Sequence, residues 1–337
     1  VPDDTLGAVP PTLDRDVALK VVTAPAEDTE EFLRRFRREQ QVQGRLGDPL
    51  RTVAIYDHGQ TVDGHPFSVL ELLEGGTLED HLDETANGGS PLSRMKEMAA
   101  SVAVAHRQGD VHRDVKPANF FVRGLILALG DFGLAEREDK LALPDGQING
   151  GIAGTPGLMA LNLYKGAAPK RASDCWALGA IGYYLLTGQS PFAADEIDEI
   201  VRLMEESPLP MRPSEIVPEI AEDPQLRRLE EIVMRALSDD RTDLLGVQSG
   251  YATAMEMLTD LALIEAKAAH EQAVDFLTVA AETAAQRQIN TSKGKEALGL
   301  AIRLGHEADR RYSGTAGIRD WLVMAHAAAY QIAQDVG

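Results

Sequence analysis

Apolar residues follow a strand-like pattern near the start of the chain and a helical pattern beyond it. Val17–Val22 is a run of apolar and β-branched residues, which is typical of a buried strand. Thr52–Tyr56 and Pro66–Leu73 indicate two further strands with a turn between them. The tripeptide Glu74-Gly75-Gly76 then breaks the strand pattern. The sequence therefore predicts an α+β fold whose small strand-rich part ends near Glu74.

One helix is expected between the first two strands. Asp28, with Glu31 three residues later, is a capping-box pattern at a helix N-terminus. The helix that follows has one face with residues at helical spacing, namely Phe32, Phe36, Glu39 and Gln43. A lone glutamate on such a face is most often a boundary residue. It becomes a functional candidate if a buried cation lies opposite it.

The rest of the chain is predicted to be mainly helical. From about Ala252 the sequence is alanine-rich, and its apolar residues keep a helical period to the end. Breaks near Asn290 and Gly314 divide this last part into three helices. The expected helices are Thr77–Glu84, Ser93–Gln108, Ser173–Thr187, Glu196–Glu206, Pro224–Leu237, Thr253–Arg287, Lys293–Tyr312 and Ile318–Asp335.

Composition narrows the classes of partner and compartment. The chain has 337 residues and a formal net charge of −20, so phosphate-rich nucleic acids and anionic membranes would be repelled. Cys175 is the one cysteine, so no intramolecular disulfide can form and a reducing, cytoplasmic location is expected. No apolar run approaches the ~18 residues that a membrane span needs. The first residues also lack the pattern of a signal peptide.

The residues with the strongest chemical signal lie between His112 and Gly133. Phosphoryl transfer from a metal–nucleotide complex needs a carboxylate to accept a hydroxyl proton, oxygen ligands for Mg²⁺, and cations near the phosphates. Asp114 can be the base, and Asn119 and Asp131 can bind the metal. Lys116 and the upstream Lys20 can supply the positive charge.

The joint pattern resembles that of one enzyme family. His112-Arg113-Asp114-Val115-Lys116, Asn119, Asp131-Phe132-Gly133 and Val17-Ala18-Leu19-Lys20 are similar to the motifs of Hanks-type (eukaryotic-like) Ser/Thr protein kinases, in particular the bacterial members. The resemblance implies a two-lobed protein kinase-like fold that uses ATP with Mg²⁺ or Mn²⁺ and phosphorylates protein substrates. It divides the chain into a small lobe (1–74), a large lobe (75–263) and a helical extension (264–337).

The resemblance also implies a role for each motif residue. Lys20 would hold the α- and β-phosphates and Glu39 would be its ion-pair partner. Asp114 would be the base, Lys116 would steady the γ-phosphate, and Asn119 and Asp131 would bind the metal. The other implied roles are adenine contacts from Ala18, Phe121, the gatekeeper Leu70 and the hinge Glu71 to Leu73, a substrate loop around Thr155, and structural roles for His112 packed on Phe132, Arg113, and Asp174 as the anchor of the catalytic loop.

The family's glycine-rich loop is missing at its expected place. Gly7 is the one glycine before Gly44, and 19 residues precede Lys20. The usual strand–loop–strand cover over the phosphates would not fit there. Three explanations stay open: the chain starts inside this hairpin, segments of it have been lost from the sequence, or the loop is degenerate. Without backbone N–H groups over the phosphates, ATP binding and the rate of transfer should fall.

Two further departures lie between Leu134 and Asn162. The family's Ala-Pro-Glu motif is replaced by Ala160-Leu161-Asn162, and Asn162 cannot make the usual ion pair with a late arginine, here Arg241. The segment from Leu134 to Gly154 contains no Ser, Thr or Tyr, so it offers no site for a phosphate that could pair with Arg113. We expect activation that does not depend on phosphorylation in this loop, with fixed negative charge from Glu136, Glu138 or Asp139.

Several functional alternatives follow from the sequence. The leading hypothesis is an active Ser/Thr kinase in a bacterial signalling pathway. The alternative is a pseudokinase or weakly active scaffold that signals through its helical extension. The missing glycine-rich loop favours this alternative. A small-molecule phosphotransferase would not be expected to keep Lys116, Thr155 and Asp174 together. Residues 264–337 are expected either to cap the large lobe or to bind a protein partner or a second copy of the chain.

Overall fold

The structure is a computed structural model, and it describes residues 16–21, 29–46, 48–63, 65–82, 89–141, 154–207, 209–238, 250–266 and 268. The chain divides into two compact units. One unit is Val1–Ile220 with Glu230–Leu258, and the other is Ala221–Leu229 with Thr259–Gly337. Every site residue named above belongs to the first unit.

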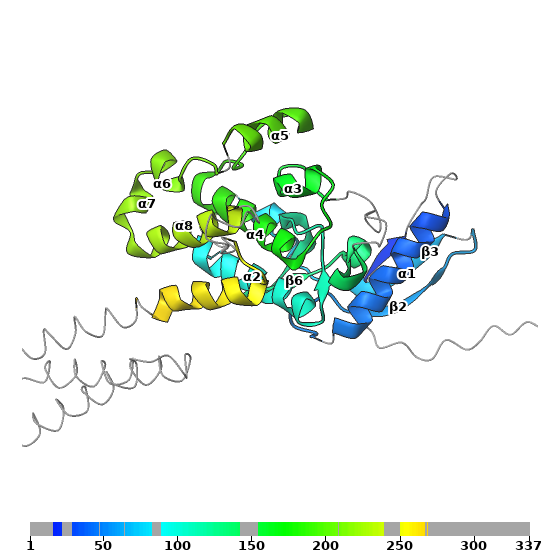
Figure 1. The fold of residues 1–337 in the computed structure, drawn as a ribbon. Coiled ribbons are helices and arrows are strands. Elements are labelled where there is room, and N and C mark those ends of the chain that lie inside the picture. The colour runs from blue at the N-terminus through cyan, green and yellow to red at the C-terminus, as the bar shows by residue number, and fades with distance from the viewer. Residues whose placement is uncertain are drawn as a thin grey trace, which may run out of the picture. The chain divides into compact units, whose positions relative to one another are not determined.

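The small lobe is an antiparallel sheet with one helix against it (Figure 1). Its strands are β1 (Val17–Val21), β2 (Ile55–Gln60) and β3 (Pro66–Glu71), in the order β1-β3-β2. The helix is α1 (Thr29–Leu46), which follows the first strand as the capping pattern predicts. β1 pairs with β3 so that Lys20 lies opposite Ser68.

Helix α1 is fixed to the sheet by buried polar side chains as well as by apolar packing. Glu39 and Gln43 are buried on the face that the sequence predicts. The amide of Gln43 donates to the carbonyl of Val53, and the amide of Gln40 donates to the hydroxyl of Ser68. Hydrogen bonds are directional, so they restrict the rotation of a helix about its own axis more than apolar contacts alone do. The direction in which Glu39 points is therefore fixed by its neighbours on α1.

The core of the large lobe lies between α2 (Pro91–Arg107) and α4 (Arg171–Thr187). The side chain of Ser90 caps the start of α2 by accepting a hydrogen bond from the N–H of Ser93. α4 packs so closely that a Cβ added at Gly182 would lie 2.8 Å from the sulfur of Met95. Glycine there allows the two helices to approach. Met95, Met98, Leu178 and Ile181 are completely or almost completely buried in this core.

The remaining elements are short and surround this core. Two antiparallel pairs, β4 (Asp110–Val111) with β7 (Glu136–Arg137) and β5 (Phe120–Arg123) with β6 (Ile126–Leu129), carry the loops of the predicted site. The two-lobed α+β fold predicted from the sequence is confirmed. The elements are η1 (Glu79–His81), β4 (Asp110–Val111), η2 (Pro117–Asn119), β5 (Phe120–Arg123), β6 (Ile126–Leu129), η3 (Phe132–Leu134), β7 (Glu136–Arg137), η4 (Glu138–Lys140), α3 (Leu161–Tyr164), α5 (Ile197–Glu206), α6 (Pro213–Ile216), α7 (Glu219–Glu222), α8 (Pro224–Leu237) and a helix over 254–266.

Two expected elements differ from the structure. The strand expected from Thr52 begins at Ile55, because the backbone of Val53 bonds with Leu129 of β6 instead of joining β3. The helix expected from Thr77 is the short 3-10 turn η1, because Thr77 bonds to the side chain of Asp80 and the N–H of Leu78 donates to the carbonyl of Phe120.

The predicted helical extension falls mostly outside the described residues. A helix covers 254–266, and the predictions for Lys293–Tyr312 and Ile318–Asp335 lie beyond the described part. The predicted boundaries at residues 74 and 263 stay predictions. Among the helices that the structure describes, none combines the length and the apolar character needed to cross a bilayer.

Candidate active site

The loop between β4 and β5 brings four of the predicted residues together around one carboxylate. The hydroxyl of Thr155 donates to Oδ1 of Asp114 over 2.8 Å. Nζ of Lys116 lies 2.8 Å from Oδ2 of Asp114. The amide nitrogen of Asn119 donates to the backbone carbonyl of Asp114 over 2.7 Å. Asp114 is thus held by neighbours on both sides, so its carboxylate has a fixed direction.

A buried aspartate on α4 shapes the start of this loop. The carboxylate of Asp174 accepts hydrogen bonds from the N–H groups of His112 (2.7 Å) and Arg113 (2.9 Å). Arg113 has a φ of 71°, a left-handed conformation that costs free energy for a residue with a side chain. The bonds to Asp174 offset that cost. Burial opposes ionisation of Asp174, but the hydrogen bonds from His106 and His112 outweigh it and keep the pKa of Asp174 below its ordinary value.

His106 belongs to the same network and was not singled out by the sequence. Its ring is buried, with Nε2 lying 2.9 Å from Oδ2 of Asp174. The N–H of Ala254 donates to the other ring nitrogen, Nδ1, over 3.0 Å. Both ring nitrogens of His106 therefore have a partner, which fixes the orientation of the ring. Burial of His106 could have been predicted from the apolar stripe of Ala99, Val102 and Ala103, but its bonding partners could not.

The predicted cation for Glu39 is present in the small lobe. Nζ of Lys20 lies 2.9 Å from Oε1 and 3.2 Å from Oε2 of Glu39, and 3.1 Å from Oδ1 of Asp131. Burial works to lower the pKa of Lys20, but the two carboxylates outweigh it and the pKa is raised. Burial raises the pKa of Glu39, which Lys20 offsets in part. The Glu39 side chain is 7% exposed and that of Lys20 is 36% exposed, so desolvation weighs more on the glutamate.

The two predicted metal ligands offer oxygen atoms suited to a hard cation. The Asp131 side chain is 46% exposed. Burial opposes its ionisation, but Lys20 outweighs it and lowers the pKa of Asp131. Asn119 uses its amide nitrogen to bond Asp114, and no described donor bonds to its amide oxygen. A carboxylate and an amide oxygen fit Mg²⁺ or Mn²⁺, which favour oxygen ligands.

The turn that carries Asp131 is held by an aromatic contact. The rings of His112 and Phe132 meet edge to face with centroids 4.8 Å apart. His112 also bonds to the carbonyl of Gly130 through Nε2 over 3.0 Å, and Phe132 is completely buried. Asp131 itself has a φ of 55°, so this non-glycine residue is in the left-handed region. The contacts on either side hold the strained residue in place.

The residues expected around adenine lie where the two lobes join. Ala18 is opposite Leu70 in the β1–β3 pairing. Glu71 ends β3, and Leu73 lies two residues beyond it. The side chain of Glu71 pairs with Arg123, so its carboxylate is already bonded. The backbone of this segment is therefore the part that could bind a base. Phe121 lies on β5, where it bridges to Thr77. The adenine roles of these residues stay predictions.

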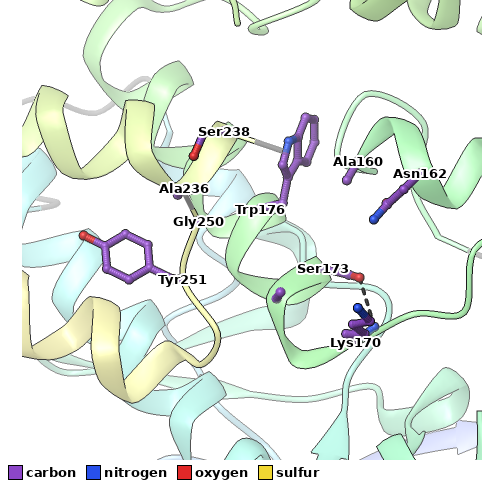
Figure 2. Close-up of a pocket in the computed structure, with 10 residues that line it drawn as sticks. Ala160, Asn162, Lys170, Ser173, Trp176, Ala236, Ser238, Gly250 and Tyr251 are labelled. Atoms are coloured by element: carbon purple, nitrogen blue, oxygen red, sulfur yellow. Dashed lines mark hydrogen bonds between the residues drawn. The ribbon is translucent and has the colours of Figure 1, made fainter. Parts of the chain in front are cut away.

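A small cavity lies beside the segment that replaces Ala-Pro-Glu (Figure 2). Its volume is about 20 Å³, roughly enough for one water molecule. Oδ1 of Asn162 is buried and has no partner in the described part of the chain. Arg241, the expected counterpart, lies outside the described residues. The residues lining the cavity are Ala160, Asn162, Lys170, Ala172, Ser173, Trp176, Ala236, Ser238, Gly250 and Tyr251.

Cys175 follows Asp174 on α4 and is buried, 1% exposed. Burial, with a smaller effect from Asp174, raises the pKa of its thiol well above the ordinary value. A protonated, enclosed thiol is a poor nucleophile. The structure therefore gives Cys175 a packing role.

The acidic residues after the Asp131 turn pair with three different arginines. Arg113 donates to the carbonyl of Leu134 over 3.5 Å, and the pairing of an acid with Arg113 stays a prediction. The observed pairs are Glu136 with Arg38, Glu138 with Arg171, and Asp139 with Arg137.

Comparison with known proteins identifies the family. Residues 8–278 match the model of the protein kinase domain, so the chain belongs to the protein kinase family. It is 39% identical over 189 residues to the serine/threonine-protein kinase PknL of Mycobacterium bovis, covering 54% of this chain and 45% of the relative. It is 30% identical over 256 residues to the serine/threonine-protein kinase PrkC of Bacillus subtilis, covering 74% and 36%.

A third relative extends further along the chain. The probable serine/threonine-protein kinase PknB of Bifidobacterium longum is 29% identical over 299 residues, or 83% of this chain and 41% of the relative. The chain thus spans less than half the length of these curated relatives. Members of the protein kinase family generally use ATP with a divalent metal ion. The resemblance to bacterial Hanks-type Ser/Thr kinases found in the motifs is confirmed.

Proposed function

We propose that this protein is a Ser/Thr protein kinase that transfers the γ-phosphate of ATP to hydroxyl groups of proteins. The observation that carries the proposal is the set of contacts around Asp114. Its carboxylate is bonded to the hydroxyl of Thr155 and to Lys116, at the start of the loop that also carries Asn119. A base must be held within hydrogen-bond reach of the proton it accepts. The bond from Thr155 supports Asp114 in this role, because the carboxylate already accepts a hydrogen bond from a hydroxyl group.

The cations and oxygen ligands have separate roles in this proposal. Lys20, oriented by Glu39, would bind the α- and β-phosphates, and Lys116 would offset charge on the γ-phosphate. Asp131 and Asn119 would bind Mg²⁺ or Mn²⁺, which would neutralise the phosphates of bound ATP. In this structure Lys20 bonds both Glu39 and Asp131, so the cation and one metal ligand already lie together. Ala18, Leu70, Glu71, Leu73 and Phe121 would surround adenine.

Lys116 favours serine and threonine over tyrosine as acceptors. It lies two residues after Asp114 and its ammonium group touches the carboxylate. This lysine is the feature by which the motif resembles Ser/Thr kinases. The names of the relatives support the same acceptor class. A bacterial signalling role and a cytoplasmic location are part of the proposal, and the single cysteine and the need for ATP support them.

The division of the chain is also proposed. Residues 1–74 and 75–263 would be the two kinase lobes, and 264–337 would contribute contacts to a protein partner or to a second copy of the chain. The proposed lobes meet at the residues expected to bind adenine, which supports the first boundary.

Transfer of radiolabelled phosphate tests the proposal directly. The full chain is incubated with labelled ATP, Mg²⁺ and a generic basic protein substrate, and Asp114→Asn is the matched control. We expect labelling of protein by the wild type and a loss of at least about a hundredfold in Asp114→Asn. Equal labelling by both proteins would contradict the role of Asp114. No labelling by the wild type, with ATP binding retained, would instead favour the pseudokinase.

A further inference from the structure

Helix α1 carries two neighbouring stripes of side chains that bond to different parts of the protein. Glu39 and Gln43 bond to the small lobe, through Lys20 and the carbonyl of Val53. Arg38, Val42 and Arg45 are spaced by four and three residues, so they form a second stripe on an adjacent face. Val42, in the middle of this stripe, is 2% exposed. The second stripe is therefore packed against protein.

Each arginine of the second stripe meets a carboxylate of the β4–β7 pair. Nη2 of Arg38 lies 2.8 Å from Oε2 of Glu136, and the two side chains are 21% and 12% exposed. Nη2 of Arg45 lies 3.1 Å from Oδ1 of Asp110, whose side chain is completely buried. The Arg38–Glu136 pair is partly buried, so it is screened less by salt than a surface pair, and Asp110 would be left buried without a cation if Arg45 were lost. These contacts can therefore hold a helix in place.

The two carboxylates are close in sequence to the proposed reacting groups. Asp110 begins β4, which leads directly into the loop of Asp114. Glu136 begins β7, which follows the turn that carries Asp131. Val111 lies opposite Glu136 in the antiparallel pairing of the two strands. One small ribbon thus supports both Asp114 and Asp131, and α1 is bonded to that ribbon.

We propose that Arg38 and Glu136 are positioning residues, and that their ion pair keeps Glu39 on Lys20 without a phosphate in the segment that follows the Asp131 turn. Arg38 is adjacent to Glu39, so a movement of α1 that withdraws Glu39 from Lys20 also breaks the pair with Glu136. The segment from Leu134 to Gly154 contains no Ser, Thr or Tyr that could supply a phosphate. Glu136 provides a permanent negative charge in that segment. This inference rests on the proposed kinase function.

A double-mutant cycle on the pair is the central test. Glu136→Gln and Arg38→Met should each lower kcat for phosphate transfer about tenfold and leave KM for the protein substrate unchanged. The double variant should be no worse than either single variant, because both remove the same contact. Arg202→Gln is the matched control, since it breaks ion pairs with Glu199 and Glu206 on the exposed helix α5. It should leave kcat unchanged, and unchanged kcat in Glu136→Gln would overturn the inference.

Phosphatase treatment tests whether the activity is independent of phosphorylation. The full chain is treated with a broad-specificity phosphatase, which is then removed, and kcat is measured in a single early time course. Retained initial activity supports the proposal. A loss of initial activity that returns after incubation with unlabelled ATP would overturn it, because a phosphate would then be required.

Hydrogen exchange separates this inference from the proposed function. If the wild type shows no Asp114-dependent transfer, the kinase proposal fails while the position of α1 remains measurable. Glu136→Gln should increase amide exchange in 36–46 at least severalfold, whereas Arg202→Gln should not. Increased exchange would support the positioning role even in an inactive protein. Unchanged exchange in 36–46 would overturn it.

Discussion

The two halves of the candidate site are held in different ways. The loop of Asp114 is fixed by Asp174, which projects from a core helix and is 2% exposed. Glu39 lies on a helix that is bonded to the large lobe by Arg38 and Arg45, whose side chains are 21% and 49% exposed. Hydrogen bonds to a buried carboxylate form only when the core is folded, whereas partly exposed ion pairs can break without unfolding.

This difference indicates which half can be regulated. Asp114 and its loop should be in place whenever the large lobe is folded. The position of Lys20 and Glu39 depends on contacts worth less free energy, so a partner or a change of charge could alter it. Substitutions that remove contacts in the two halves should therefore differ in how much they lower the free energy of unfolding.

Asp174→Asn should have the largest effect on stability. An asparagine keeps one acceptor oxygen but places an N–H₂ group against N–H donors, so at least one buried hydrogen bond is lost. Urea unfolding should show a loss of about 3 kcal/mol, because hydrogen bonds to charged groups contribute roughly 1.5–3 kcal/mol each. Asp195→Asn changes an exposed aspartate of the same lobe and should be nearly neutral. A loss below about 1 kcal/mol in Asp174→Asn would contradict the anchor role.

The contribution of Asp174 should depend on pH in a defined direction. Its pKa is lower in the folded protein than the ordinary value of 3.8, so the folded state binds the proton less tightly than the unfolded state. The stability it contributes is therefore fully present above pH 3.8 and is lost as the pH falls through the folded pKa. The difference in unfolding free energy between wild type and Asp174→Asn should be constant from about pH 7 to pH 5 and shrink below about pH 3.8. A difference that grows on acidification would be inconsistent with a lowered pKa.

Arg45→Gln should lower the free energy of unfolding less than Asp174→Asn does. It leaves Asp110 buried without its arginine, but Arg45 is half exposed and water can replace part of the contact. We expect a loss of about 1 kcal/mol in urea unfolding, against roughly zero for Arg202→Gln. A loss as large as that of Asp174→Asn would remove the contrast between the two halves of the site.

The motif residues could be predicted because their spacing is short and their chemistry demanding. Asp114, Lys116 and Asn119 lie within six residues of each other, and the structure places their side chains around one carboxylate. For Glu39 the sequence predicted only the helical face, and the structure adds the cation opposite it, the half-buried Lys20.

Long-range polar partners could not be predicted in the same way. His106 bonds to Ala254, which is 148 residues away, and no local pattern contains that contact. Glu136 was a candidate partner for Arg113, but its observed partner is Arg38, which belongs to the other lobe. Thr52 looked like the start of a strand, yet its hydroxyl and its N–H both bond to the carbonyl of Asp48, so the strand begins later.

The burial of Cys175 makes site-specific labelling practical for this protein. It is the one cysteine of the sequence, and its enclosed, protonated thiol should react slowly with maleimides. A cysteine introduced at an exposed position such as Arg37 on α1, with a second at Arg202 on α5, could therefore carry a pair of fluorophores without removal of the native thiol. Energy transfer between the two dyes would then report on α1 in single molecules during turnover.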